Sequence, residues 1–300
     1  MLSVVITAWN EEKNLPRAIS SVKRIADEVV VVVDEASTDK TLDIAKKLKC
    51  QVYTHPHTGI VEPMRNWSIA KAEGDWILLL DADEEVTSQL ANKITKLITS
   101  GKVNYYRISR KNMIFGKWVK SEHWWPDYVY RLFKKGAVTW EDAIHSVPFT
   151  RGVGEDLPPT EDLAIVHHNY ETISQFIDRS NRYTDHMLQH QLDQGYSFAW
   201  SDILTKPMEE FLRQYFARKG YKEGLHGLAL SLLLAATELT LHLKLWQQSG
   251  FVPVQVTPDQ VQEVNKQQQV QLKWWLYQAK IELSPWPLNW VLKLKRKMGI

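Results

Sequence analysis

The first hundred residues alternate short apolar runs with longer segments whose apolar side chains recur at helical spacing. The runs that are too short for buried helices, and are predicted as strands, are 3–7, 28–33, 50–54 and 75–80. The segments predicted as helices are 15–26, 37–48 and 63–72. Apolar strands that alternate with helices predict an α/β fold in which a mostly parallel sheet is flanked by helices on both faces.

The pattern changes after about residue 103. Two strands of a mixed extension are predicted at 104–109 and 128–133, with a Trp-rich loop between them. From about residue 172 onward the pattern is mostly helical. We therefore predict an α/β domain over 1–170, made of the halves 1–100 and 101–170, and a helical C-terminal region over 171–300.

The composition narrows the class of protein. A formal net charge of +2 over 300 residues argues against a nucleic-acid binder held by general charge. Cys50 is the only cysteine, so no intrachain disulfide can form and a reducing compartment is expected. The N-terminus begins with a strand-like run and no basic segment, which predicts a cytoplasmic protein without a signal peptide.

Polar side chains follow three of the four predicted strands. In an open parallel sheet, ligands bind beyond the carboxyl ends of the strands, so these side chains are expected to meet at one edge. The residues after the strands are Thr7, Ala8, Asn10 and Glu11 (first strand), Asp34 (second strand), and Asp81, Ala82 and Asp83 (fourth strand). We predict that they form one ligand site.

Asp81 and Asp83 carry the sharpest chemical signal. Two carboxylates two residues apart can share Mg²⁺ or Mn²⁺, which prefer hard oxygen ligands. Such an ion would stabilise the charge that develops on a departing diphosphate. The alternative is that the acids only favour the N-terminus of a helix at 86–98. Asp34 could accept a hydrogen bond from a base N–H, and Arg65 could reach a diphosphate or remain a solvated surface side chain.

Several enzyme classes lack their motifs in this chain. No G-x-G-x-x-G follows the first strand and no G-x-x-x-x-G-K-[ST] occurs, which argues against dinucleotide-binding proteins and P-loop NTPases. Cys50 lies inside a predicted strand, so it is not expected to be a nucleophile.

Four segments carry a family resemblance. Residues 3–22, 30–45, 65–85 and 124–136 resemble successive motifs of family 2 glycosyltransferases with the GT-A fold. Within that family the chain is most similar to the bacterial lipopolysaccharide-core β-glucosyltransferase group, whose C-terminal helical motif resembles residues 220–246. The resemblance implies an inverting transfer from a nucleotide-sugar donor, a UDP-sugar by preference, to a lipopolysaccharide-type or lipid-linked glycan. The resemblance further implies that residues 1–100 form the nucleotide-binding half of the α/β domain and residues 101–170 the acceptor half.

The resemblance also assigns roles. Asp34 would contact the donor base, and Asp81 and Asp83 match the D-x-D motif, in which the second aspartate usually holds the metal. A carboxylate base is needed for the acceptor hydroxyl. Our first choice for this base is Asp127, with Glu141 or Asp142 as the alternative. The other expected site residues are Arg131 (facing phosphate or the acceptor), Trp124 and Trp125 (a sugar platform) and His145 (a third metal ligand or a structural histidine).

Two positions depart from the family pattern. Ser146 follows His145 where the group usually has glutamate, so the role of that acid is not carried over to this chain. Ala36 stands where the family normally has glycine after the second acid, so a shifted loop is expected there.

Two C-terminal segments bear on membranes. Segment 225–243 is apolar, but three polar side chains interrupt it, and a buried or in-plane helix is predicted instead of a span. The tail 284–300 places tryptophans beside lysines and an arginine, which suits an anionic inner leaflet. Its alternative is a solvated helical end packed on its own domain. The predicted location is therefore cytoplasmic and peripheral on the inner face of the cell membrane.

The sequence is compatible with three functions. The first is a glycosyltransferase that uses Mg²⁺ or Mn²⁺. The second is a non-catalytic, membrane-associated sugar-nucleotide binder, in which the acid pair would look the same. The third is a metal-dependent phosphatase or phosphotransferase, although those enzymes place their acid pair after the first strand. A homo-oligomer is compatible with each of them.

Overall fold

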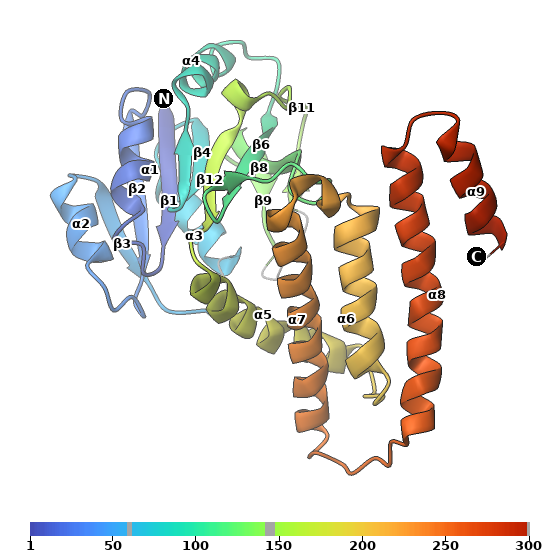
Figure 1. Cartoon of the computed structure of the whole chain (residues 1–300). Helices are drawn as coiled ribbons and strands as arrows, with labels where there is room; N and C mark the ends of the chain where they lie inside the picture. The colour runs from blue at the N-terminus through green and yellow to red at the C-terminus, as the bar shows by residue number, and fades with distance from the viewer. Residues whose placement is uncertain (59–61, 142–147, 299–300) are drawn as a thin grey trace. The chain divides into compact units, whose positions relative to one another are not determined.

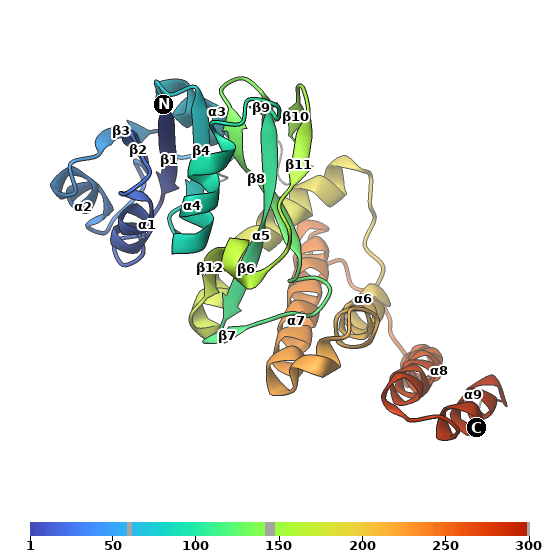
Figure 2. The same ribbon diagram turned by 90° about the horizontal axis from the view of Figure 1, so that it is seen from above.

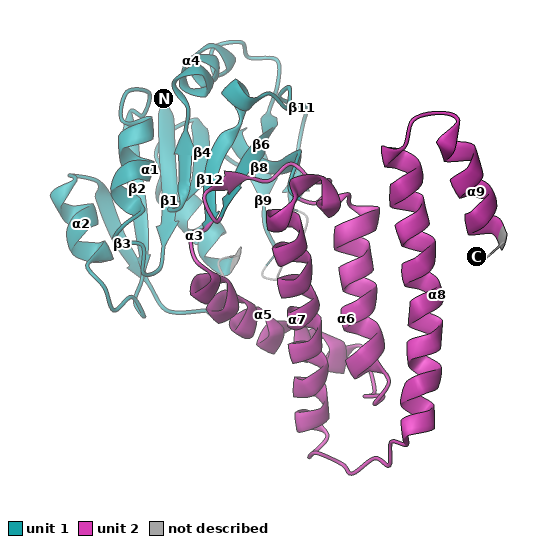
Figure 3. Ribbon diagram, in the orientation of Figure 1, with its two compact units in different colours: residues 1–114, 124–169 teal, residues 115–123, 170–300 magenta. Residues whose placement is uncertain are grey.

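The computed structural model describes residues 1–58, 62–141 and 148–298. The chain divides into two compact units (Figure 3). The first comprises residues 1–114 and 124–169, and the second comprises 115–123 and 170–300.

The first unit is built on one sheet with the strand order β3-β2-β1-β4-β8-β6-β12-β5 (Figure 1). Its strands are β1 (Leu2–Ala8), β2 (Glu28–Asp34), β3 (Gln51–His55), β4 (Trp76–Asp81), β5 (Glu84–Val86), β6 (Tyr105–Ile114), β8 (Asp127–Lys134) and β12 (Ile165–Tyr170). The first four strands are parallel, whereas β8 is antiparallel to β4 and to β6. The predicted α/β fold with a mostly parallel sheet and a mixed extension is confirmed.

Short elements complete this unit. β11 (Gly154–Asp156) pairs with β6. A separate two-stranded ladder joins β9 (Val138–Thr139) and β10 (Phe149–Thr150). The single 3-10 helix of the unit is η1 (Glu161–Leu163) among the residues described here.

Helices cover both faces of the sheet (Figure 2). They are α1 (Leu15–Val22), α2 (Thr41–Lys47), α3 (Glu62–Lys71) and α4 (Ser88–Leu97). One apolar cluster packs the even-numbered positions of β1 against α1 and α4. A second cluster packs the opposite face of the same strands against α3 and Trp140. Because successive side chains of a strand point to opposite faces, two such clusters are the expected result of a strand that is buried at every position, as β1 is.

The strand register decides which polar side chains share a face. Thr7 lies opposite Val32 on one side and opposite Asp81 on the other. Asp34 is two residues beyond Val32 and therefore points to the same face. Thr7, Asp34 and Asp81 thus leave the sheet at its carboxyl edge on the face covered by α3, which carries Arg65. The carboxyl ends of β1, β2 and β4 thus lie at one edge of the sheet, and the expectation that their polar residues form one ligand site stays a prediction.

The second unit is helical. Its helices are α5 (Ile173–Asp193), α6 (Asp202–Leu212), the π-helix η2 (Arg213–Ala217), the 3-10 helix η3 (Gly220–Glu223), α7 (Leu225–Gln248), α8 (Pro258–Leu283) and α9 (Leu288–Met298). Helix α7 packs on α5 and α6, and α9 packs on α8. By length and composition alone α7 could cross a membrane, and no other helix in the described ranges meets both criteria.

Residues 115–123 belong to the helical unit although they lie between two strands of the sheet in sequence. This segment contains β7 (Lys117–Trp118). Its Lys117 ammonium lies 2.8 Å from a carboxylate oxygen of Glu223, and the Lys120 N–H donates to the other oxygen of that carboxylate at 2.7 Å. The sequence analysis placed this segment in the acceptor half of the α/β domain. Contacts with η3 tie it to the second unit instead.

Candidate active site

Asp81 lies at the end of β4 and is held by two arginines. Its Oδ1 is 3.4 Å from Nη2 of Arg65, and its Oδ2 accepts a hydrogen bond from Nη2 of Arg131. Burial raises the pKa of Asp81, but the guanidinium groups of Arg131 and Arg65 outweigh this effect and hold the pKa well below the usual aspartate range. Asp81 is therefore a carboxylate at every physiological pH.

Arg131 is 2% exposed and joins two carboxylates. Besides Asp81 it donates to Oε1 of Glu84 at 2.7 Å, and Oε2 of Glu84 accepts the Asp81 N–H at 3.1 Å. A buried guanidinium needs such partners, because an unpaired charge in the interior is strongly unfavourable. The predicted contact of Arg131 with phosphate or the acceptor stays a prediction. The contacts described here give this residue a supporting role beneath Asp81.

The structural alternative for the acid pair is wrong. Asp81 ends β4, Asp83 lies in the turn after it, and the next two acids, Glu84 and Glu85, lie in the short strand β5. Helix α4 has no acidic residue in its first turn, and its N-cap is Thr87, whose side chain accepts a hydrogen bond from the Leu90 N–H. The acids therefore do not serve to complement the dipole of that helix.

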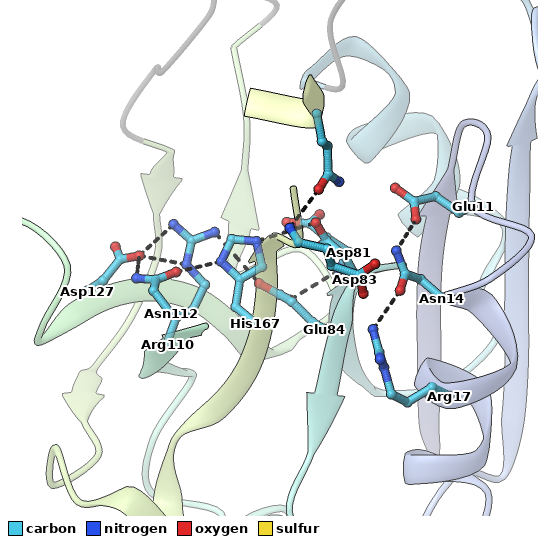
Figure 4. A network of polar contacts seen from close by, with 12 residues as sticks. Glu11, Asn14, Arg17, Asp81, Asp83, Glu84, Arg110, Asn112, Asp127 and His167 are labelled. Carbon is cyan, nitrogen blue, oxygen red and sulfur yellow. Dashed lines mark hydrogen bonds and ion pairs between the residues drawn. The ribbon is translucent and has the colours of Figure 1, made fainter. Parts of the chain in front are cut away.

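Asp83 is 8% exposed and faces a histidine that the sequence analysis did not predict. His167 of β12 has its Nε2 3.5 Å from Oδ2 of Asp83 (Figure 4). β12 pairs antiparallel with β5, and His167 lies opposite Glu84 in that register. The strand pairing thus brings His167 to Asp83 across more than eighty residues of chain.

Asp83 and His167 fit a divalent cation as two of its ligands. Two ligand atoms that each lie about 2.1 Å from one ion are separated by about 3.0 to 3.5 Å, and the Oδ2–Nε2 distance is 3.5 Å. Within the described ranges, no group of three or more His, Cys, Asp or Glu side chains converges to hold a metal.

Asp34 is buried at the end of β2, and both of its carboxylate oxygens have partners. Oδ1 accepts the Ala36 N–H at 2.8 Å, and Oδ2 lies 2.8 Å from Nδ1 of His57. The ring of His57 in turn lies 5.1 Å from that of Trp9. A donor base that contacts Asp34 would therefore also meet these two rings, neither of which the sequence analysis predicted.

The geometry of the turn after Asp34 explains why position 36 can be alanine instead of glycine. Ser37 donates its N–H to the Asp34 carbonyl at 2.9 Å, and the backbone of Ala36 does not adopt a positive φ. Glycine is required only where φ is positive. The expected shift of this loop is unnecessary, because the turn forms with an ordinary backbone at Ala36.

The loop after β1 is fastened to the loop after β2. Oδ1 of Asn10 accepts the Thr38 N–H at 2.8 Å, and the Glu11 N–H donates to Oγ1 of Thr41 at 2.8 Å. The Glu11 carboxylate accepts from Asn14 at 2.7 Å (Figure 4). Asn10 and Glu11 therefore hold the loops that border the site, and their predicted contact with the donor stays a prediction.

Asp127 begins β8 and lies among polar groups of β6. Its Oδ2 accepts hydrogen bonds from Nε of Arg110 at 2.8 Å and from Nδ2 of Asn112 at 3.0 Å. Its side chain is 24% exposed, so solvent and a substrate can reach it. Asp127 is thus a positioned, accessible carboxylate.

The remaining predicted acceptor-side residues fall into two groups. Trp124 and Trp125 are half-buried just before β8, and Glu141 is exposed. Asp142 and His145 lie outside the described residues. Their predicted roles as alternative base and third metal ligand stay predictions.

A parallel sheet that gathers carboxylates and arginines beyond its carboxyl edge defines the class of α/β proteins that bind ligands at that edge. Residues 3–151 match glycosyl transferase family 2. An uncharacterised glycosyltransferase of Rickettsia typhi is 30% identical over 244 residues, which cover 78% of this chain and 82% of that protein. The chain belongs to glycosyl transferase family 2. It is a glycosyltransferase with the GT-A fold that the resemblance implied.

The chain is also similar, at lower sequence identity, to the following three proteins. The lipopolysaccharide core biosynthesis glycosyltransferase LpsC of Rhizobium meliloti is 22% identical over 263 residues, covering 83% of this chain and 93% of LpsC. The structure of Staphylococcus aureus TarS covers 86% of this chain and 94% of its own, with 13% identity and a TM-score of 0.44. Glucosyl-3-phosphoglycerate synthase from Mycobacterium tuberculosis, solved with Mn²⁺ and UDP, has a TM-score of 0.38, 15% identity and coverages of 62% and 78%.

Proposed function

We propose that this protein transfers a sugar, with inversion, from a nucleotide diphosphate donor to a lipopolysaccharide-type or lipid-linked glycan. The observation that carries the proposal is that Asp81 at the end of β4, Asp83 in the turn after it and Asp127 at the start of β8 belong to one polar network at the carboxyl edge of the sheet (Figure 4). The name of the LpsC relative supports an acceptor of the lipopolysaccharide class. UDP is the preferred nucleotide because the buried Asp34 carboxylate can accept the N–H of uracil.

Each group has a defined task in this proposal. Asp83, with His167 beside it, would hold Mg²⁺ or Mn²⁺ through side-chain oxygen and nitrogen. When bound, the ion supplies positive charge to the departing diphosphate. Asp81, held by Arg131 and Arg65, stays a carboxylate at the end of β4. Asp127 accepts the proton of the acceptor hydroxyl as the oxygen attacks the anomeric carbon.

Donor binding gives the direct test. A thermal-shift screen of the full chain with UDP-sugars, GDP-sugars and ADP-sugars, with and without Mn²⁺, is expected to select one nucleotide only when Mn²⁺ is present. A ligand at about 100 times its Kd stabilises the folded state by about 2.7 kcal/mol, which raises Tm by several degrees. Free sugar with Mn²⁺ is the control. If no nucleotide sugar raises Tm, the proposed donor class is refuted.

We also propose that the C-terminal tail attaches the protein to the inner face of the cell membrane. Trp286 is 80% exposed, and Trp290 of α9 is 61% exposed. Between residues 270 and 297 there are six cationic side chains and one carboxylate. Exposed indoles beside lysines suit an anionic lipid surface, which attracts each cation and accommodates the rings at the headgroup level.

Vesicle binding tests the tail. The full chain is expected to sediment with phosphatidylglycerol vesicles and to be released at high salt, because salt screens the lysines. Replacing Trp286 and Trp290 by serine should weaken this binding about tenfold or more. Leu48→Ser, which changes a side chain 41% exposed on the α/β unit, is the matched control. Equal binding by the tail variant and wild type would contradict the proposal.

A further inference from the structure

We infer that Asn112 is a positioning residue that holds the candidate base and the Asp83 side of the site in one fixed geometry. The inference rests on the proposed function, because it assigns Asn112 a task in that reaction. Asn112 lies on β6 and is 0% exposed. A fully buried amide is costly unless its donors and acceptor are satisfied, and the contacts of Asn112 run to three other segments of the unit.

The partners determine which way the amide faces. Nδ2 of Asn112 lies 2.9 Å from the Trp124 carbonyl oxygen and 3.0 Å from Oδ2 of Asp127. Both of these oxygens accept hydrogen bonds only, so the nitrogen of the amide must face them. Oδ1 of Asn112 must therefore face His167, whose Nδ1 is 2.6 Å away.

This orientation fixes the proton on His167. An amide oxygen can only accept, so Nδ1 of His167 carries the hydrogen and donates to Asn112. Nε2 is then the ring atom directed at Oδ2 of Asp83, 3.5 Å away. Asn112 thus orients the imidazole in the way that a hydrogen-bonded neighbour orients a metal-binding histidine.

The same amide holds the acceptor side. Through the Trp124 carbonyl and the Asp127 carboxylate it fastens both ends of the turn that precedes β8. A second route, from Arg110 to Glu84 and Arg131, joins Asp127 to Asp81. That route consists of ion pairs and does not reach His167 or the Trp124 carbonyl in the contacts described. Asn112 therefore couples the base to the metal side through directional hydrogen bonds of its uncharged amide (Figure 4).

Three variants separate positioning from general stabilisation. Asn112→Ala removes all three bonds. Asn112→Asp keeps an oxygen for the His167 N–H but cannot donate to Asp127 as a carboxylate. Ser109→Ala is the control, because Ser109 is on the same strand, 1% exposed, and its hydroxyl has no partner among the described residues.

Kinetics and donor binding are measured together. Asn112→Ala is expected to lower kcat of sugar transfer by roughly 10- to 100-fold, the cost of a misplaced base. The Kd of UDP, measured at saturating Mn²⁺ so that a more weakly held ion is still bound, should change less than threefold. Ser109→Ala should match wild type in both. In an Asp127→Asn background, Asn112→Ala should lower kcat little further, because its main effect passes through that carboxylate. An additive loss in the double variant, or a loss of UDP affinity equal to the loss of kcat, would overturn the inference.

A spectroscopic readout makes the inference independent of turnover. Long-range ¹H–¹⁵N spectra of ¹⁵N-histidine-labelled protein report which ring nitrogen carries hydrogen, and the His167 signals are assigned by their absence in His167→Gln. Wild type and Asn112→Asp should show Nδ1 of His167 protonated, whereas Asn112→Ala should lose this preference. An unchanged pattern in Asn112→Ala refutes the inference even in a protein that transfers no sugar. Absence of transfer by wild type refutes only the proposed function.

Discussion

The Asp83→Asn variant is expected to lose metal-dependent sugar transfer by about 100-fold or more and to keep its fold. Two unit charges about 4 Å apart interact by roughly 4 kcal/mol at an effective dielectric of about 20, and each 1.36 kcal/mol is a factor of ten in rate. Asparagine has the same shape as aspartate but carries no charge. The measurement is transfer from labelled nucleotide sugar at saturating Mn²⁺, together with Tm.

Glu85→Gln is the matched control for that variant. Glu85 is two residues away, its side chain is 39% exposed, and its carboxylate lies 3.3 Å from Nε2 of His168 and not beside His167. Neutralising it removes the same charge from the same acidic segment, so near-normal transfer is expected. If Asp83→Asn transfers as fast as Glu85→Gln, Asp83 does not hold the ion.

The Asp127→Asn variant is expected to bind donor normally and to lose transfer by about 10² to 10⁴-fold, the range associated with removal of a general base. The asparagine side chain can still accept a hydrogen bond from Arg110, so the local structure should persist. It cannot accept the proton of the acceptor hydroxyl. The measurement is kcat for transfer beside the Kd of UDP with Mn²⁺ for the same preparation.

Asp156→Asn is the matched control for Asp127→Asn, because it also removes a carboxylate that is paired with an arginine. Asp156 accepts from Arg107 at 2.6 Å and its side chain is 41% exposed on β11. This variant should transfer normally. Normal turnover by Asp127→Asn would place the base elsewhere, and Glu141 and Asp142 would be the next carboxylates to replace. A parallel loss of donor affinity would instead indicate a structural role for Asp127.

The strands were predictable because each apolar run in the first hundred residues is too short for a helix and ends at polar residues. β2 and β4 lie within one residue of the predicted runs 28–33 and 75–80 at each end. Helix ends were less accurate. α1 stops at Val22 although apolar spacing continues to Ala26. Spacing alone does not report where a helix stops packing against its sheet.

Half of the candidate site was visible in the sequence. Asp81 and Asp83 were found because they follow directly on an apolar strand, and local order along the chain implies their place at the sheet edge. His167, Asn112 and Glu84 were missed. Each looks like an ordinary strand residue, and its importance comes from partners that lie far away in the chain. For His167, the available signal was that polar residues, His167 and Asn169, alternate with Ile165 on one face of β12.

The sequence by itself determined the class of fold, the order of the first four strands and of the helices between them, and the edge at which acidic residues gather. Those features follow from the period of apolar side chains and from the direction of each strand. Only the tertiary structure decided that β12 pairs with β5, that β6 lies beside β8, and therefore that His167 and Asn112 stand between Asp83 and Asp127. Strand pairing between distant segments depends on the packing of the whole sheet, and no local pattern encodes it.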